Sequence, residues 1–148
     1  MNEMIKADNL RVKDMIYEFN GVEVMLDTDL ARLYGVETKR INEAVSRNKM
    51  KFPERYAFKI SELEYRNLKS QFSTSSLKNN YGGARKGHIA FTEQGVYMLA
   101  TILRSERATE VSIRIMDTFV KMRHYINYNN NLLPNRVLLL MNFILKSI

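Results

Sequence analysis

The residues near the start of the chain follow a pattern that predicts a β-hairpin. Residues 15–26, MIYEFNGVEVML, contain two β-prone runs separated by Asn20 and Gly21. These two residue types accept the positive φ angles of a tight primed turn. We therefore expect two antiparallel strands joined at Asn20 and Gly21.

Apolar residues at helical spacing predict two short helices after the hairpin. We expect Asp27 or Thr28 to be the N-cap of the first helix and Gly35 to end it. Its apolar side consists of Leu30, Ala31, Leu33 and Tyr34. The second helix is expected from residue 37 or 38 to Asn48, because Pro53 prevents any further extension.

The middle of the chain combines short elements with a long polar segment. A strand over residues 56–60 is followed by a helix near residues 61–70, where Ser61 and Glu64 form a capping box. Residues 70–87 are rich in Ser, Asn and Gly and predict a long surface loop. The strand HIAF, residues 88–91, and a helix capped by Thr92 follow.

The last part of the chain predicts helices interrupted by a linker. Ser105 is expected to cap a longer helix, and the asparagine-rich INYNNNLLP, residues 126–134, predicts a linker. Residues 135–148 are a strongly apolar helix candidate, too short to span a bilayer, which we consider an oligomerisation segment. The predicted organisation is therefore a domain over residues 1–125, the linker 126–134 and the C-terminal helix 135–148.

Composition narrows the classes of protein. The 148 residues include no cysteine, which excludes disulfides, zinc-thiolate sites and a cysteine nucleophile and suits the reducing cytoplasm. The N-terminus does not resemble a secretory signal, and no apolar run reaches membrane-spanning length. We therefore expect a cytoplasmic protein that does not enter the membrane.

The net charge of +7 is unevenly distributed along the chain. Residues 1–37 contain 4 Lys and Arg against 8 Asp and Glu, whereas residues 38–91 contain 12 against 4. Such a basic segment favours a polyanionic partner, because neutralised phosphates release condensed counterions. A solvated lysine-rich surface would have the same composition, so the charge alone does not distinguish a nucleic-acid-binding surface from an ordinary polar one.

The stretch DLARLYGVETKRINEAVSR, residues 29–47, predicts a helix-turn-helix. Ala31 is small enough for a helix crossing, and Gly35 suits the turn between the helices. The apolar anchors are Leu30, Val36, Ile41 and Val45. The predicted fold is α+β: a helix-turn-helix, winged-helix-like core with an N-terminal β-hairpin, short additional strands and C-terminal helices.

The outward side of the second helix carries residue types suited to DNA. Asn42 can bind adenine, Glu43 can accept from cytosine, and Lys39 or Arg47 can reach guanine or phosphate. Arg40 suits a phosphate. In a winged variant of the fold, the basic residues after the helix, Lys49, Lys51, Arg55 and Lys59, would follow the phosphate backbone. The predicted DNA-binding residues are Thr38, Lys39, Arg40, Asn42, Glu43, Ser46, Arg47, Lys49, Lys51, Arg55, Arg85 and Lys86. The same residues are also compatible with an ordinary wet polar surface.

Several separated motifs resemble one known family. They are VMLDTDLARLYGVETKRINEAVSRN, FPERYAFKIS, the TSS and GGAR elements, AFTEQGVYMLATIL and SERATEVSIRIMDTFVKMR, in this order over about residues 15–123. Together they resemble the phage-type ORF-six-N domain, allied to the KilA-N superfamily. The resemblance implies a small α+β DNA-binding domain of phages, prophages and mobile elements, often beside antirepressor-like regions and without a catalytic centre. This chain departs from the family after GGAR, where it has Lys86-Gly87-His88 instead of aromatic or proline-containing sequence.

These observations predict a sequence-specific binder of double-stranded DNA, as a phage-type transcriptional regulator or antirepressor without metal or cofactor. We expect a homodimer, because one short helix contacts few base pairs. One alternative is an antirepressor-like module that binds a protein such as a repressor, its helix pair being structural. The other is a metal-dependent nuclease, whose ligands would converge on a cation. The candidate ligands would be His88, Glu93, Glu106, Glu110, Asp117 and His124. Such spacing arises often on exposed helices, so we do not expect an enzyme.

Overall fold

The computed structural model describes residues 11–71, 87–132 and 144 of the chain. In order along the chain, the elements are η1 (Val12–Met15), β1 (Tyr17–Phe19), β2 (Val22–Leu26), α2 (Asp27–Tyr34), α3 (Thr38–Arg47), η2 (Lys49–Lys51), β3 (Ala57–Ile60), α4 (Glu62–Lys69), β4 (His88–Phe91), α5 (Glu93–Leu103) and α6 (Glu106–Leu132). Contacts divide the chain into two compact units, residues 1–116 and 117–148. The fold described next is that of the first unit, and it confirms the α+β prediction. The winged-helix-like arrangement is not confirmed.

The four described strands form one sheet in the order β1-β2-β4-β3, and all neighbours are antiparallel. The predicted hairpin is confirmed, since β1 and β2 pair through a turn in which Asn20 has a φ of 52° and Gly21 a φ of 81°. β4 pairs with β2 on one side and with β3 on the other. Strands far apart in sequence therefore meet at the centre of the sheet.

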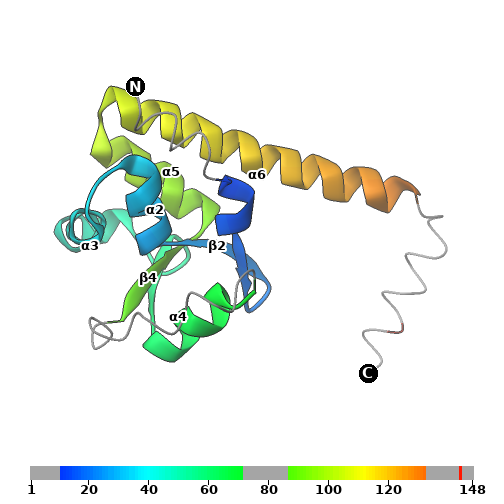
Figure 1. The fold of residues 1–148 in the computed structure, drawn as a ribbon, viewed down its shortest axis with the longest axis horizontal. Helices are drawn as coiled ribbons and strands as arrows, with labels where there is room; N and C mark the ends of the chain where they lie inside the picture. The colour runs from blue at the N-terminus through cyan, green and yellow to red at the C-terminus, as the bar shows by residue number, and fades with distance from the viewer. Residues whose placement is uncertain (1–10, 72–86, 133–143, 145–148) are drawn as a thin grey trace. The chain divides into compact units, whose positions relative to one another are not determined.

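Helices cover both faces of this sheet, as Figure 1 shows. One face includes Leu26 and Ala90, which belong to a core cluster with Leu68 of α4. The opposite face, with Met25 and its register partner Phe91, lies toward α2 and α5. Because strand side chains alternate between the faces, each strand contributes to both layers of core. α4 thus lies on one side of the sheet, and α2, α3 and α5 lie on the other.

The helix pair after the hairpin is anchored by complete burial of aliphatic residues. Leu30 and Leu33 of α2 and Ile41 of α3 are 0% exposed. Burying each such side chain contributes about 1.5–3 kcal/mol relative to leaving it in water. Ala31, 3% exposed, supplies the small side chain that the sequence predicted on this side of α2. The orientation of α3 therefore depends on a dense apolar contact.

Local hydrogen bonds confirm most of the predicted helix ends. Ser61 and Glu64 form the capping box of α4, and the Thr92 hydroxyl accepts from the Gly95 N–H at the start of α5. The Ser105 hydroxyl accepts from the Ala108 N–H where α6 begins. These caps satisfy backbone groups that a helix end would otherwise leave unpaired.

The predicted N-cap of α2 is wrong. Leu26 holds the N-cap position, and α2 begins at Asp27. Asp27 is 0% exposed, and its Oδ2 accepts from the Ile89 N–H at 3.0 Å. The carboxylate therefore joins α2 to β4, a tertiary role that hydrogen-bonding patterns within a helix do not reveal.

α6 is a continuous helix as far as Leu132. Residues 126–132, which the sequence assigned to a linker, are therefore helical, since asparagine lowers helix propensity only modestly. The second unit, residues 117–148, is helical over 117–132 in its described part. The predicted C-terminal helix, residues 135–148, and most of the loop 70–87 lie outside the described residues. None of the described helices combines the length and apolar character needed to cross a bilayer.

Candidate nucleic-acid interface

A tight turn centred on Gly35 sets the direction of α3. Gly35 has a φ of 70° and a ψ of 35°, and its N–H bonds to the Arg32 carbonyl at 3.3 Å. The Val36 N–H bonds to the Ala31 carbonyl at 3.0 Å. Glycine adopts this left-handed conformation without the steric cost that a β-carbon brings. The predicted turn residue is confirmed, and α3 begins at Thr38.

α3 has one buried side and one broad polar side. Ile41 and Ala44 are buried against the rest of the first unit. Among the predicted DNA-binding residues of α3, the exposed ones are Lys39, Arg40, Ser46 and Arg47, and the half-buried ones are Thr38, Asn42 and Glu43. The outward direction predicted from the helical wheel is therefore observed for Lys39, Ser46 and Arg47, whereas Asn42 and Glu43 are only partly exposed.

The polar side of α3 forms one wall of an open groove of about 950 Å³. The α3 wall and the turn after it contribute Lys39, Asn42, Glu43, Val45, Ser46 and Lys49. The opposite side consists of Ala57, Phe58 and Lys59 of β3, with Gly87 and Ile89 at β4. The groove thus lies between the second helix of the pair and strands that follow it in the chain. The sequence analysis did not predict that these segments are neighbours.

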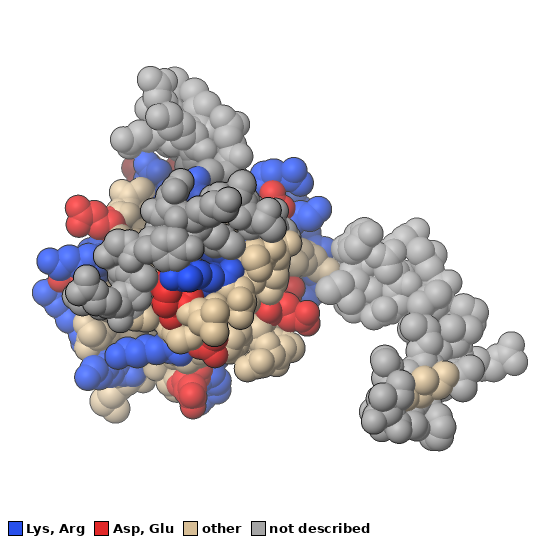
Figure 2. All heavy atoms as spheres, turned by 60° about the horizontal axis from the view of Figure 1, so that its bottom comes forward, with Lys and Arg blue, Asp and Glu red and all other residues tan. Residues whose placement is uncertain are grey.

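Positive charge dominates the groove. Lys39, Lys49 and Lys59 are exposed, and within the described residues no carboxylate lies at ion-pair distance from their ammonium groups. Glu43 is the acidic side chain among those that line the groove. Figure 2 shows blue Lys and Arg side chains, with some red Asp and Glu atoms beside them, at the left margin, the side on which Figure 1 places α3. Unpaired ammonium groups of this kind attract an anionic ligand.

Asn42 has an unusual environment on the groove wall. Its Oδ1 is buried and has no hydrogen-bond partner among the described residues. An unpaired buried carbonyl oxygen costs about 1–3 kcal/mol of desolvation. The adenine contact predicted for Asn42 would require this amide to turn outward.

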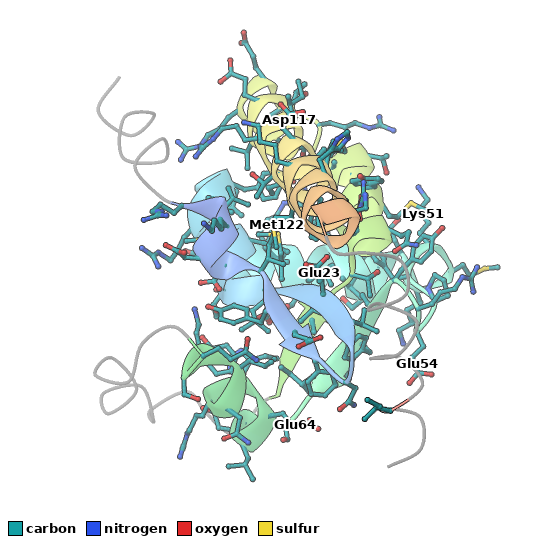
Figure 3. The ribbon with its side chains drawn as sticks, turned by 90° about the vertical axis from the view of Figure 1, so that its right-hand side faces the viewer. Glu23, Lys51, Glu54, Glu64, Asp117 and Met122 are labelled. Carbon is teal, nitrogen blue, oxygen red and sulfur yellow. The ribbon has the colours of Figure 1, made fainter. Side chains whose placement is uncertain are left out.

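Two of the predicted basic residues after α3 occupy a different part of the surface. Lys51 and Arg55 are exposed and do not line the groove. Lys51 points outward from the molecule in Figure 3, and the Arg55 guanidinium lies 5.3 Å from the centre of the Tyr56 ring. The other predicted basic contacts, Arg85 and Lys86, lie outside the described residues. Of the predicted set, the structure therefore brings together in the groove Lys39, Asn42, Glu43, Ser46 and Lys49.

The sequence analysis missed a buried polar cluster at the start of α2. His88 Nδ1 lies 3.3 Å from Asp27 Oδ1, and His88 Nε2 lies 3.1 Å from Glu62 Oε1. The Tyr65 ring stacks on the imidazole, with centroids 3.6 Å apart. Burial lowers the pKa of His88, but its hydrogen bonds and charge interactions with Asp27 and then Glu62 raise it, and the net pKa lies above the ordinary value.

A second carboxylate in the same region is also paired. Asp29 is 1% exposed; its Oδ2 accepts from the Tyr17 hydroxyl at 3.1 Å and its Oδ1 from the Lys69 ammonium at 2.6 Å. Burial and the neighbouring Asp29 carboxylate raise the pKa of Tyr17. Acidic residues are common at the start of a helix, so the sequence pattern did not indicate this cluster. The unusual feature is that the two carboxylates are almost completely buried. This cluster joins α2, α4 and the sheet.

The candidate nuclease ligands do not form a metal site within the part of the chain that the structure describes. No three His, Cys, Asp or Glu side chains in that part could hold a metal ion together. His88 is engaged with Asp27 and Glu62 as described above. The arrangement that the structure does provide is a cationic groove.

The fold and this groove define the class of protein: an α+β domain in which a helix pair presents a basic surface beside a small sheet. The profile of the ORF6N domain matches residues 14–102, and the chain belongs to this family. The match confirms the phage-type resemblance carried by the motifs from residue 15 onward, and it ends before the last of those motifs. Membership points to a phage-type regulatory or DNA-binding family. Comparison with curated proteins found no match, and comparison with solved structures found none.

Proposed function

We propose that this chain binds double-stranded DNA in a sequence-specific manner, with the exposed side of α3 in the major groove. The observation that carries the proposal is the presentation of α3: Lys39 and Arg47 are exposed, while Ile41 anchors the opposite side in the core. An α-helix fits the major groove of B-DNA, and its cations gain affinity by releasing counterions. The ORF6N family assignment supports the same function.

In this proposal the protein acts as a phage or prophage regulator, as a transcription factor or an antirepressor. We also propose a homodimer, because two copies of one short helix read a longer site. Residues 135–148 remain the candidate dimer segment. Sedimentation of the full chain and of a chain ending at residue 132 tests this part, since truncation should yield monomers. A dimer that survives truncation would contradict the assigned segment.

The decisive experiment is a titration with duplex DNA across a series of salt concentrations. The logarithm of affinity should fall with the logarithm of salt, with a slope of about 0.9 for each phosphate engaged. The double variant Lys39→Ala/Arg47→Ala should bind much more weakly and lose part of this slope. Lys13→Ala/Lys121→Ala removes the same charge from exposed positions outside α3 and serves as the matched control.

Three outcomes would contradict the proposal. Equal losses in both double variants would mean that net charge, not the α3 surface, governs binding. If the protein shows no affinity for duplex DNA at any salt concentration, the alternative of a protein-binding module is favoured. Nicking of plasmid in the presence of Mg²⁺ or Mn²⁺ would instead favour the nuclease alternative.

A further inference from the structure

The exposed surface of α3 has two flanks, and only one of them faces the groove. Lys39 and Ser46 line the groove. Arg40 and Arg47 are exposed but do not line it. These two arginines are seven residues apart, about two helical turns, so they lie on the same side of α3. Basic side chains therefore stand on both flanks of the helix.

A helix in a major groove meets a sugar–phosphate backbone on each flank. An α-helix with its side chains is about 10–12 Å across, and the major groove is about 12 Å wide. Neither flank of α3 can then avoid a backbone. On the flank of Arg40 and Arg47 the surface is open, whereas on the other flank a backbone would have to enter the groove between α3 and β3.

The cations of that groove come from separate parts of the fold. Lys39 belongs to α3, Lys49 to η2 and Lys59 to β3. Their ammonium groups outnumber the carboxylate of Glu43 on the same surface. Because no described carboxylate neutralises them, an anion entering the groove displaces none of the ion pairs found among the described residues. A negatively charged polymer with closely spaced charges matches this arrangement.

The shape and floor of the groove also suit a nucleic-acid backbone. Val45, Ala57 and Ile89 contribute apolar surface, against which deoxyribose can pack. Lys59 pairs in register with Ile89 in the sheet, so its backbone is held firmly. The volume of about 950 Å³ is at the upper end of the roughly 300–1,000 Å³ of ligand sites. It is large enough for a short stretch of backbone.

We infer that this groove holds the sugar–phosphate backbone of one DNA strand and that Lys59 of β3 contacts a phosphate there. The inference rests on the proposed function, since it requires α3 to occupy the adjacent major groove. It gives one residue of the basic segment after α3 a defined contact, in a groove shared with α3, and it gives the sheet a part in DNA binding. It also places Asn42, on the groove wall, beside the backbone instead of a base edge.

The test compares Lys59→Ala, Lys59→Arg and Lys13→Ala on a duplex enriched by selection from a random library. Loss of one phosphate contact should lower the salt slope by about 0.9 and weaken binding about equally for all sequences. Lys59→Arg keeps the charge and should retain the slope, and Lys13→Ala, exposed on η1, should behave like the unchanged protein. Thermal unfolding of each variant verifies that the exposed substitution leaves the fold intact.

Duplexes with single neutral methylphosphonate linkages locate the contact. The unchanged protein should lose affinity at one linkage beside the α3 site, and Lys59→Ala should lose nothing further there. If Lys59→Ala keeps the full slope while Arg40→Ala/Arg47→Ala, on the flank outside the groove, loses part of it, α3 binds DNA and Lys59 contacts no phosphate in the groove. If the unchanged protein binds no duplex at all, the proposed function fails first, and the inference fails with it.

Discussion

The guanidinium group of Arg107 in α6 lies against Gly35, the residue that ends α2. A β-carbon built on Gly35 would stand 2.7 Å from Arg107 Cζ. The exposed turn that directs α3 is therefore approached by a side chain from a helix more than sixty residues later in the chain. Two separate requirements, a positive φ and a close neighbour, select glycine at this position.

Gly35→Ala is expected to lower the free energy of unfolding by about 1–3 kcal/mol. The left-handed conformation costs an L-residue about 1–2 kcal/mol, and the Arg107 side chain must also shift. Gly21→Ala is the matched control, because Gly21 has a φ of 81° but nothing within 4 Å of a β-carbon. Chemical denaturation compares the two. Gly35→Ala with unchanged stability would contradict the requirement for glycine.

Gly95→Ala is expected to destabilise the protein more than Gly35→Ala. A β-carbon on Gly95 would stand 1.9 Å from the Tyr56 carbonyl oxygen, which is backbone and also accepts from the Thr92 N–H. Overpacking of this kind costs about 1–3 kcal/mol or more, whereas helix propensity alone would favour alanine by about 1 kcal/mol. The sign of the change in thermal midpoint therefore decides between the two effects.

His88 is expected to make stability depend on pH. Both ring nitrogens face carboxylates, and only the protonated imidazole can donate to both. Because the folded pKa of His88 is raised, its contribution is fully present below the unfolded value of about 6.5. It is lost as the pH rises from there through the higher folded pKa.

Urea denaturation at a series of pH values measures this dependence for the unchanged protein and for His88→Gln. The unchanged protein should lose stability from about pH 6.5 upward, and the variant should lose less over the same range. NMR titration of the His88 ring gives the folded pKa directly. A ring that titrates below the ordinary value would contradict the assignment.

Tyr34 of α2 and Ser112 of α6 share a buried hydrogen bond of 2.7 Å between their hydroxyl groups. Burial raises the pKa of Tyr34 to about 12. Tyr34→Phe should cost about 1–2 kcal/mol, because it leaves the buried Ser112 hydroxyl unpaired. The double variant with Ser112→Ala should cost less than the sum of the single changes. Additive costs would show that the two hydroxyl groups are not coupled.

The sequence predicted which side chains of α3 are most exposed, but it did not predict the groove in which part of them lie. The exposure of Lys39 and Arg47 followed from the helical period of α3, which needs only neighbouring residues. The groove that Lys59 shares with α3 did not follow from it, because β3 meets α3 only through the fold. Asn42 shows the same limit of the sequence analysis. An asparagine on the polar side of a helix suggested a contact with a base, but its Oδ1 is buried. That burial depends on surrounding segments, which a helical wheel does not include.

The sequence by itself determined the local features of this protein. The Asn20–Gly21 hairpin, the Gly35 turn and the Ser61–Glu64 capping box depend on backbone preferences and on side chains a few residues apart. Only the tertiary structure decided that Asp27 would accept from the Ile89 N–H, 62 residues away. It likewise decided that a lysine of β3 would share a groove with α3. Such contacts depend on how strands pair across the chain, and that pairing reflects burial of the whole core, which no short stretch of residues encodes.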